Sequence, residues 1–118
     1  MKTIVEKEKP VILVDLDGTL AEYFGWNGPE HIGNPIGPMV ARVNNWILKG
    51  FEVRIFTART CNPEQIPLIE KWCLKHIGVK LVVTNVKDFS AVEIWDDRAV
   101  RVVANTGMPC CQKFREPV

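Results

Sequence analysis

The sequence lacks a long apolar run, a large excess of charge of either sign, and more than a few histidines or cysteines. Its 118 residues include two histidines and four cysteines, and Lys and Arg exceed Asp and Glu by only one. No stretch approaches the roughly 20 apolar residues that a membrane span requires. A net charge of +1 supplies no broad positive field, so a nucleic acid is expected only as a substrate.

Signals for export and for disulfide bonding are also missing. The N-terminus, MKTIVEKEKP, has charged residues where a signal peptide has an apolar run, and it has no small-residue cleavage site. The cysteines, two of them adjacent at Cys110 and Cys111, are not spaced like those of a compact secreted scaffold. We therefore expect reduced thiols in a soluble, cytoplasmic protein. No pattern indicates an oligomeric state.

The composition is that of one globular domain covering residues 1–118. Hydrophobic residues make up 47% of the chain, which is enough for a core of its own. A chain of this length buries roughly two-thirds of the surface that its unfolded form exposes, so it needs no structural metal to fold. A metal site, if there is one, is expected to serve chemistry.

Short β-branched runs alternate with stretches of helical periodicity. The continuous apolar run at residues 11–14 predicts a central, buried strand. Further strands are expected at 51–56, 81–83, 92–95 and 100–103, and helices at 39–48 and 63–76. This alternation predicts an α/β fold with a doubly wound, mostly parallel sheet of about five strands. Residues 21–38, rich in Gly and Pro, are expected to form a flap.

Acidic residues follow two of the predicted strands. Asp15 and Asp17 come directly after the first strand, Thr57 follows the second, and Asp96 and Asp97 follow the fourth. The carboxyl ends of parallel strands meet at the edge where such sheets bind ligands. Carboxylates gathered there repel one another unless a cation compensates. Oxygen ligands with little histidine or cysteine nearby suit Mg²⁺, which also binds phosphoryl oxygens, so a phosphorylated substrate is implied.

These residues resemble the four motifs of the haloacid dehalogenase superfamily. Its first motif, an apolar strand followed by D-x-D-G-T, is matched by residues 15–19. Thr57 is similar to the second motif, Lys87 in TNVKDF to the third, and the pair Asp96 and Asp97 to the fourth. The resemblance covers residues 11–103 and implies a Rossmann-like core. Lys75 and Lys80 are competitors of Lys87 for the third motif.

The resemblance implies a magnesium-dependent phosphatase that works through an aspartyl-phosphate intermediate. Its catalytic residues would be Asp15 as nucleophile and Asp17 as acid and then base, with Thr57 and Lys87 holding phosphoryl oxygens. The metal site would comprise Asp15, Asp17 through its backbone carbonyl, and carboxylates of Asp96 and Asp97. The substrate-binding set would be Thr57, Ala58, Arg59 and Lys87, and Arg59 or Arg98 could offset the remaining negative charge.

The resemblance also bears on the substrate. The gap after the first motif is a flap of about twenty residues and the gap before the third motif is a few residues long, so no cap domain is expected. Capless members have open sites that often accept bulky substrates such as polynucleotide ends, phosphoproteins or glycan precursors. This is analogy at the level of the family and does not identify the substrate.

Two other functions combine similar residues. A receiver domain of a signalling system also places aspartates, a threonine and a lysine on a doubly wound sheet, but its phosphorylated aspartate follows the third strand, where this chain has none. A module that binds a phosphorylated ligand without turnover would not need Asp17 beside Asp15. We therefore favour the enzyme over both signalling alternatives.

Some remaining residues have two readings. Tyr23, Phe24 and Trp26 in the flap are expected either to form a stacking platform over the site or to form the flap's own small core. His31 is expected to be a surface residue. Cys61 follows Thr57 closely, but no histidine base accompanies it, so it is not expected to act as a nucleophile.

Overall fold

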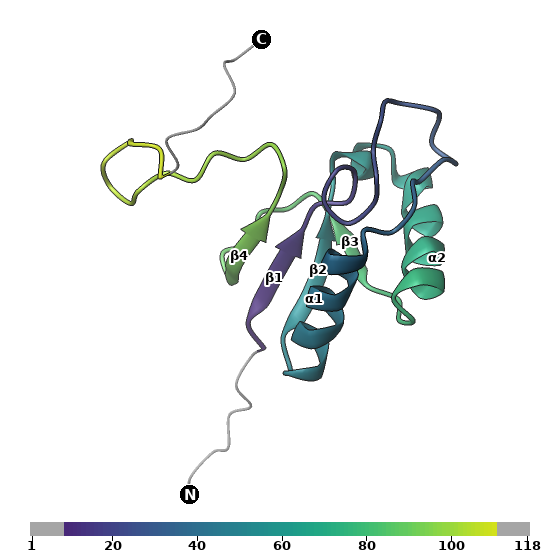
Figure 1. Cartoon of the computed structure of the whole chain (residues 1–118), viewed down its shortest axis with the longest axis horizontal. Coiled ribbons are helices and arrows are strands. Elements are labelled where there is room, and N and C mark those ends of the chain that lie inside the picture. The colour runs from purple at the N-terminus through teal and green to yellow at the C-terminus, as the bar shows by residue number, and fades with distance from the viewer. Residues whose placement is uncertain (1–8, 111–118) are drawn as a thin grey trace, which may run out of the picture.

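The computed structural model describes residues 9–110, which form one parallel sheet with helices along the chain between its strands (Figure 1). The elements are β1 (Val11–Val14), α1 (Gly37–Leu48), β2 (Glu52–Phe56), the short 3₁₀ helices η1 (Ala58–Cys61) and η2 (Pro63–Gln65), α2 (Ile66–His76), β3 (Val82–Thr84) and β4 (Ala91–Trp95). All neighbouring strands are parallel, in the order β3-β2-β1-β4. The prediction of an α/β fold with a parallel sheet is confirmed.

Strand β1 is the centre of the sheet, as the sequence predicted. It pairs with β2 on one side and β4 on the other, and all four of its residues are buried. A strand buried on both faces has no polar side to expose, which explains the unbroken apolar run. This position puts the residues that follow Val14 between the ends of β2 and β4.

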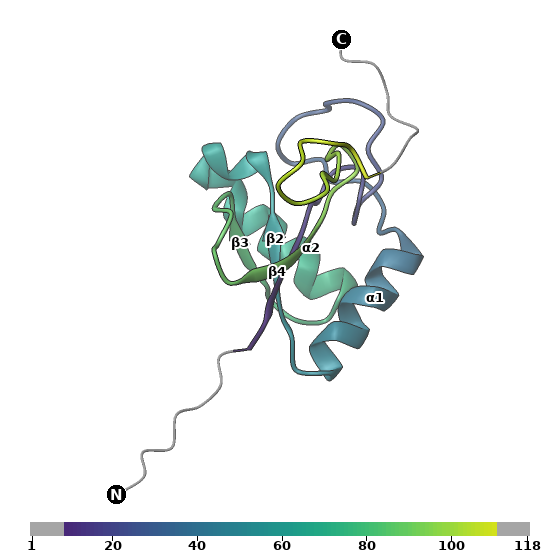
Figure 2. The ribbon, with the colours of Figure 1, turned by 90° about the vertical axis from the view of Figure 1, so that its left-hand side faces the viewer.

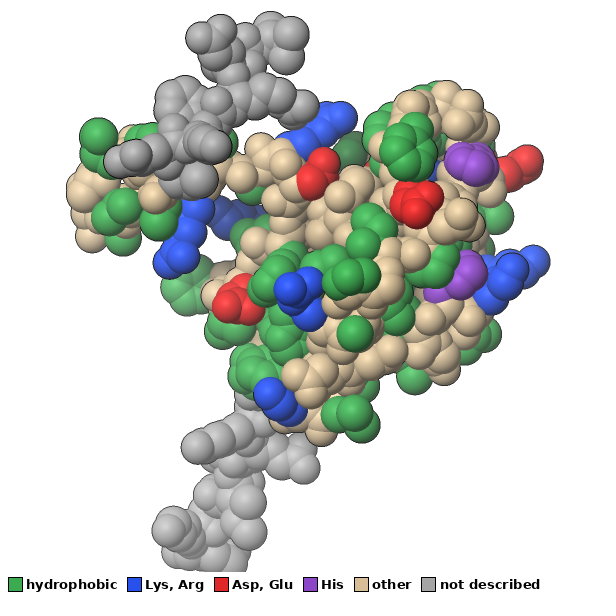
Figure 3. Space-filling view, in the orientation of Figure 1, with side chains coloured by type: hydrophobic (Ala, Val, Ile, Leu, Met, Phe, Trp, Pro, Cys, Tyr) green, Lys and Arg blue, Asp and Glu red, His purple; other side chains and the backbone are tan. Residues whose placement is uncertain are grey.

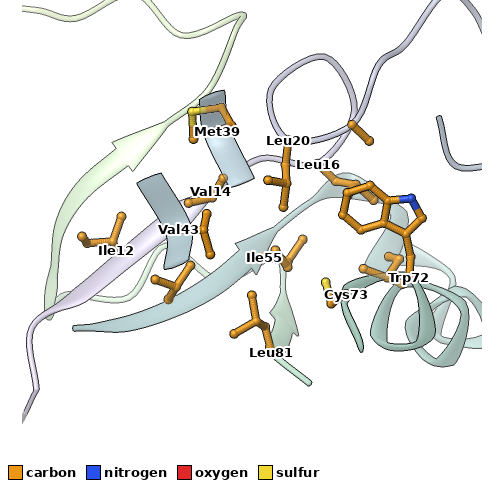
Figure 4. Packing of buried hydrophobic residues seen from close by; sticks show 13 residues of the cluster. Ile12, Val14, Leu16, Leu20, Met39, Val43, Ile55, Trp72, Cys73 and Leu81 are labelled. Atoms are coloured by element: carbon orange, nitrogen blue, oxygen red, sulfur yellow. The ribbon is translucent and has the colours of Figure 1, made fainter. Parts of the chain in front are cut away.

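The hydrophobic core lies on one face of the sheet. Ile12 and Val14 of β1 contribute side chains to it, as do two residues of β2 (Figure 4). Both helices pack against this face. The helix residues buried in the same cluster are Met39 and Val43 of α1 and Ile69, Trp72 and Cys73 of α2.

The doubly wound arrangement is not confirmed in the described part of the chain. Both helices cover the same face, and the connection between β3 and β4 at residues 85–90 contains no helix. Arg54 of β2 instead makes an ion pair with Asp88 of this connection at 3.2 Å. Because the connection between β3 and β4 is short and contains no helix, no helix within residues 9–110 covers the second face of the sheet.

The expected fifth strand at residues 100–103 is not a strand of the sheet. The sheet has four strands within residues 9–110, and Val102 makes an isolated antiparallel bridge with Pro109. Val103 donates its backbone N–H to the carbonyl of Met108 at 2.8 Å. The β-branched run thus pairs within its own turn, which projects beyond β4 in Figure 1.

The two ends of the flap pair with each other, and the second end is also held by α2. Ala21 bridges to Pro35, Glu22 donates its N–H to Asn34 at 2.8 Å, and the Trp72 indole N–H donates to the carbonyl of Gly33 at 3.0 Å. Helix α1 begins at Gly37, two residues before the predicted start, because Pro38 suits the first turn of a helix. The flap is therefore a loop with paired ends that stops earlier than expected, at residue 36.

The surface carries charges of both signs (Figure 3), and the cysteines in the described part of the chain are free. Charged side chains of both signs are interspersed on the face shown in Figure 3. Cys61, Cys73 and Cys110 form no disulfide, and Cys111 lies outside the described residues. Within residues 9–110, no helix is both long and apolar enough to cross a membrane.

Candidate functional site

The chain segments that carry the predicted site residues meet at one end of the sheet. Figures 1 and 2 show the flap, η1 and the segment after β4 at the end toward which the strand arrows point. Asp15 and Asp17 follow β1, Thr57 follows β2, and Asp96 and Asp97 follow β4. All five line one pocket of about 920 Å³. The structure therefore brings these five residues together, as the sequence predicted.

The turn after β1 requires glycine at position 18. Gly18 has a φ of +89°, which favours glycine, and a Cβ built there would lie 2.6 Å from a carboxylate oxygen of Asp97. The backbone N–H groups of Leu20 and Ala21 both donate to the carbonyl of Leu16, which closes the turn. Glycine in this turn therefore lets the segment after β4 come close to the segment after β1.

Three carboxyl groups form a compact cluster in this pocket. Ligand oxygens of Asp15, Asp96 and Asp97 all lie within 4.8 Å of one another. The Thr19 hydroxyl donates to the Asp97 carboxylate at 3.1 Å and accepts the Asp97 backbone N–H at 3.1 Å, and the Arg98 N–H donates to Asp96 at 2.8 Å. Carboxylate oxygens held this close fit a hard divalent cation such as Mg²⁺.

The electrostatics of the cluster disfavour the charged form of Asp15. The pKa of Asp15 is raised from its ordinary 3.8 to about 7. Burial is the largest cause, followed by a hydrogen bond with Asp97 and the negative charges of Asp96 and Asp97. A hydrogen bond from the backbone N–H of Leu16 acts in the opposite direction. A nucleophilic carboxylate has to be ionised, so a bound cation would favour the reactive form of Asp15.

Metal-free protein should therefore become less stable as the pH rises. Between about pH 4 and pH 7, Asp15 keeps in the folded state a proton that the unfolded state has released, so the free energy of unfolding falls over this window. The loss is complete once the pH exceeds the pKa of about 7 that Asp15 has in the folded state. Thermal unfolding in the presence of a chelator at pH 5 and pH 8 measures it.

The variant Asp15→Asn isolates this contribution, because other groups titrate in the same range. Its unfolding temperature should change less between pH 5 and pH 8 than that of the wild-type protein. Identical pH profiles for the two proteins would show that Asp15 is ionised as easily in the folded chain as in the unfolded one.

Asp17 is held separately from the carboxylate cluster. Both of its oxygens accept hydrogen bonds from Arg59, from Nε at 2.8 Å and from Nη2 at 2.9 Å. Its carboxylate is not part of the cluster that Asp15, Asp96 and Asp97 form. The arrangement agrees with the expectation that Asp17 would contact a metal only through its backbone carbonyl.

Arg59 connects Asp17 to the flap. Its guanidinium also donates to the backbone carbonyls of Pro29 at 3.2 Å and His31 at 2.9 Å, and it lies over the Trp26 ring at 4.9 Å. Arg59 is only 7% exposed. A buried guanidinium needs such a set of acceptors, so one side chain fixes both the position of Asp17 and the inner part of the flap.

The other predicted phosphoryl-binding residues fall in different places. Thr57 is buried, and its hydroxyl accepts the backbone N–H of Arg59 at 3.2 Å, while Ala58 also lines the pocket. Lys87 is exposed on the β3–β4 connection and is not among the residues that line the pocket. Arg98 does line it. The role of Lys87 stays a prediction, and Arg59 and Arg98 are the pocket's cations within residues 9–110.

The chain matches no known family model, no curated protein and no solved structure.

Sequence reasoning missed three carboxamide residues of the pocket, Asn62, Gln65 and Asn85. Asn85 directly follows β3, so the rule that ligands bind at the carboxyl ends of parallel strands would have pointed to it. Asn62 is the N-cap of η2, and Gln65 is its last residue. Their position depends on how the chain turns from β2 into α2, for which the sequence carried no separate signal.

The flap aromatics do not form a small core of their own. Phe24 is 91% exposed, whereas Tyr23 and Trp26 line the site pocket. His31 is exposed, as expected, although its carbonyl holds Arg59. Cys61 also lines the pocket, and its sulfur lies 4.0 Å from the side-chain nitrogen of Asn85. The arrangement favours the platform reading for Tyr23 and Trp26.

Proposed function

We propose that this chain is a magnesium-dependent phosphatase of the haloacid dehalogenase-like kind, acting in the cytoplasm through an aspartyl-phosphate intermediate on Asp15. The observation that carries the proposal is the compact cluster of Asp15, Asp96 and Asp97 in the same pocket as Asp17 and Thr57. A nucleophile, an acid, a hydroxyl donor and a cation site are the parts that phosphoryl transfer from an ester to a carboxylate requires.

In the first half-reaction, an oxygen of the Asp15 carboxylate attacks phosphorus and the bond from phosphorus to the ester oxygen breaks. After it has parted from Arg59, Asp17 takes up a proton from the solvent and gives it to the departing oxygen, so the alcohol leaves neutral. Thr57 has its hydroxyl at the end of β2, facing the same pocket, where it can donate to a phosphoryl oxygen. The products of this step are the free alcohol and phosphorylated Asp15.

In the second half-reaction, Asp17 accepts a proton from water, which attacks phosphorus and breaks the bond to Asp15. Inorganic phosphate leaves, Asp15 is again a free carboxylate, and Asp17 releases its proton to the solvent when it pairs with Arg59 again. Because Arg59 occupies both oxygens of Asp17, the carboxyl group has to part from the guanidinium to reach the substrate. Asp17 thus exchanges one partner for another during each turnover.

The charge of the pocket explains why the proposal includes magnesium. Four carboxylates and two guanidinium groups line it, which leaves a net charge of −2 before any ligand binds. A phosphate dianion would be repelled by this charge. Asp15, Asp96 and Asp97 would hold the ion, which when bound would neutralise charge on the carboxylates and on the phosphoryl oxygens. Without such an ion, the negative charge of the pocket would oppose the binding of a phosphate ester.

The direct test is hydrolysis of a panel of phosphate monoesters with and without Mg²⁺. Phosphate release should depend on added Mg²⁺ and disappear with a chelator, and the panel should include small esters, nucleotides and sugar phosphates. A protein that takes up a phosphoryl group on Asp15 from a small donor but never releases it would favour the receiver-like alternative. No Mg²⁺-dependent release from any ester would refute the proposal.

Replacing Asp96 with Ala should raise the Mg²⁺ concentration needed for half-maximal activity by about 10-fold or more, because the ion loses an oxygen ligand. Asp97→Ala should have a smaller effect, since Asp97 is the more exposed of the two. The measurement is a Mg²⁺ titration of turnover.

Asp88→Ala is the matched control for these variants. Asp88 is a carboxylate on the β3–β4 connection that pairs with Arg54 and does not line the pocket, so its removal should leave the Mg²⁺ titration unchanged. If Asp97→Ala proves more sensitive to Mg²⁺ than Asp96→Ala, the two roles should be exchanged.

A further inference from the structure

The pocket extends past the carboxylates to a wall of three carboxamides. Asn62 and Gln65 come from the turn before α2, and Asn85 directly follows β3. The pocket's volume of about 920 Å³ is near the upper end of the range for sites that hold whole drug-sized ligands, and far exceeds what a phosphoryl group needs. The carboxamide wall is therefore available to the part of a substrate that carries the phosphate.

Gln65 has an unmet hydrogen-bonding group at this wall. Its side chain lines the pocket, the residue is only 8% exposed, and its amide oxygen is buried without a hydrogen-bond partner. Buried polar groups are nearly always paired, so an orphan at a binding pocket points to a donor that arrives with the ligand. Because the oxygen is covered in this structure, a ligand N–H or O–H would reach it once the amide turns toward the pocket.

The other two carboxamides also have hydrogen-bonding capacity left over. Asn62 uses its side-chain oxygen to accept the backbone N–H of Glu64 at 3.2 Å, which leaves its NH₂ group free to donate. Asn85 reaches only the Cys61 sulfur, at 4.0 Å, which is a weak contact. A carboxamide can donate and accept but carries no charge. The wall is therefore suited to a neutral group with donors and acceptors along its edge.

Aromatic side chains line the same pocket. Tyr23 and Trp26 approach from the flap and Phe56 from the end of β2. Tyr23 and Trp26 are 37% and 54% exposed, so part of each remains open to a ligand. Stacking favours a flat ring over a bare sugar or an alkyl chain, and carboxamides pair with the edges of bases. The combination matches a nucleobase.

We propose that the substrates are phosphate monoesters of nucleosides, with the base held between the carboxamide wall and the flap aromatics. This assignment rests on the phosphatase function proposed above. The same chemistry is offered by a free mononucleotide and by the end of a polynucleotide. Because the net charge of the chain is only +1, recognition has to come from the base and its phosphate ester instead of a long phosphate backbone.

The first test compares substrates that differ by the base. With Mg²⁺ present, kcat/KM of the full chain is measured for adenosine 5′-monophosphate, adenosine 3′-monophosphate and ribose 5-phosphate. At least one nucleotide should exceed the sugar phosphate by roughly 5- to 150-fold, the range expected for one stacked base. Equal kcat/KM values for all three would overturn the assignment.

The second test uses variants of the carboxamide wall. Gln65→Met keeps a similar volume but removes the amide, and it should lower the nucleotide-to-sugar ratio of kcat/KM by about 10-fold. Asn85→Ala tests the same wall at a second position if Gln65→Met does not fold. Asn44→Ala, at an exposed amide of α1 that does not line the pocket, should leave the ratio unchanged. Wild-type ratios in both wall variants would overturn the assignment.

A third measurement separates this assignment from the phosphatase function. Calorimetric binding of adenosine, which has no phosphate to release, reports on the base site alone. Binding that is weakened by Gln65→Met supports the base site even if no ester is hydrolysed, in which case only the phosphatase proposal fails. Hydrolysis of esters without any adenosine binding and without nucleotide preference overturns the base site alone. A 5′- and a 3′-phosphorylated oligonucleotide then distinguish a polynucleotide end from a mononucleotide.

Discussion

Replacing Asp15 with Asn is expected to lower phosphate release by on the order of 10³-fold or more while the protein stays folded. The amide has nearly the same shape as the carboxylate, but it has no charged oxygen with which to attack phosphorus. Asp15 has no charged partner of opposite sign in the cluster, where its neighbours are Asp96 and Asp97. The measurement is phosphate release under saturating Mg²⁺, compared with the wild-type chain.

Stability provides the control for this variant. Because Asp15 is partly buried beside two other carboxyl groups, removing its charge should raise the unfolding temperature of the metal-free protein at pH 8. Lost activity together with gained stability would separate the chemical role of Asp15 from any role in folding. A folded Asp15→Asn protein that retains near-wild-type turnover would refute the assignment of the nucleophile.

The intermediate can also be sought directly. Acid quenching of the wild-type protein during turnover should leave a phosphoryl group on the peptide that contains Asp15, and mass spectrometry should detect it. The same peptide from Asp15→Asn should carry none. A phosphoryl group found on another residue, such as Cys61 in the same pocket, would require a different nucleophile.

Local patterns in the sequence were enough to predict the centre of the fold and the acidic part of the site. The apolar run Val11–Val14 predicted a central, buried strand, and the structure has it in the interior of the sheet. Once that strand and β4 were placed side by side, Asp15, Asp96 and Asp97 had to follow neighbouring parallel strands at the same edge. Topology thus fixed their proximity without knowledge of side-chain conformations.

What could not be predicted depends on contacts between segments that are distant along the chain. The run Val100–Val103 has strand-forming composition, but its residues pair with the turn that follows instead of with β4. Lys87 has the expected order along the chain, yet Lys87 itself does not line the pocket, whereas Asn85 of the same connection does. The contact of Arg59 with Asp17 spans 42 positions and with Pro29 spans 30. No local pattern encodes such pairings.

Asp17→Asn should impair esters with poor leaving groups far more than esters with good ones. A general acid typically contributes 10²- to 10⁴-fold, and an alkyl phosphate depends on that proton because an alkoxide is a poor leaving group. The ester of an acidic phenol depends on it much less. The expected result is a loss of roughly 10²- to 10⁴-fold for an alkyl phosphate and a clearly smaller loss for para-nitrophenyl phosphate. The measurement is kcat for both esters at saturating substrate.

Arg59→Lys is the matched variant that separates acid catalysis from positioning. Lysine keeps the charge but cannot reproduce the two hydrogen bonds to Asp17 or the additional bonds to the carbonyls of Pro29 and His31. It should lower kcat for both esters by similar factors, because Asp17 keeps its proton-transferring group but loses its fixed starting position. Asp17→Asn, in contrast, should make the rate depend more steeply on the leaving group. Equal losses for the two esters in Asp17→Asn would mean that Asp17 positions other groups and transfers no proton.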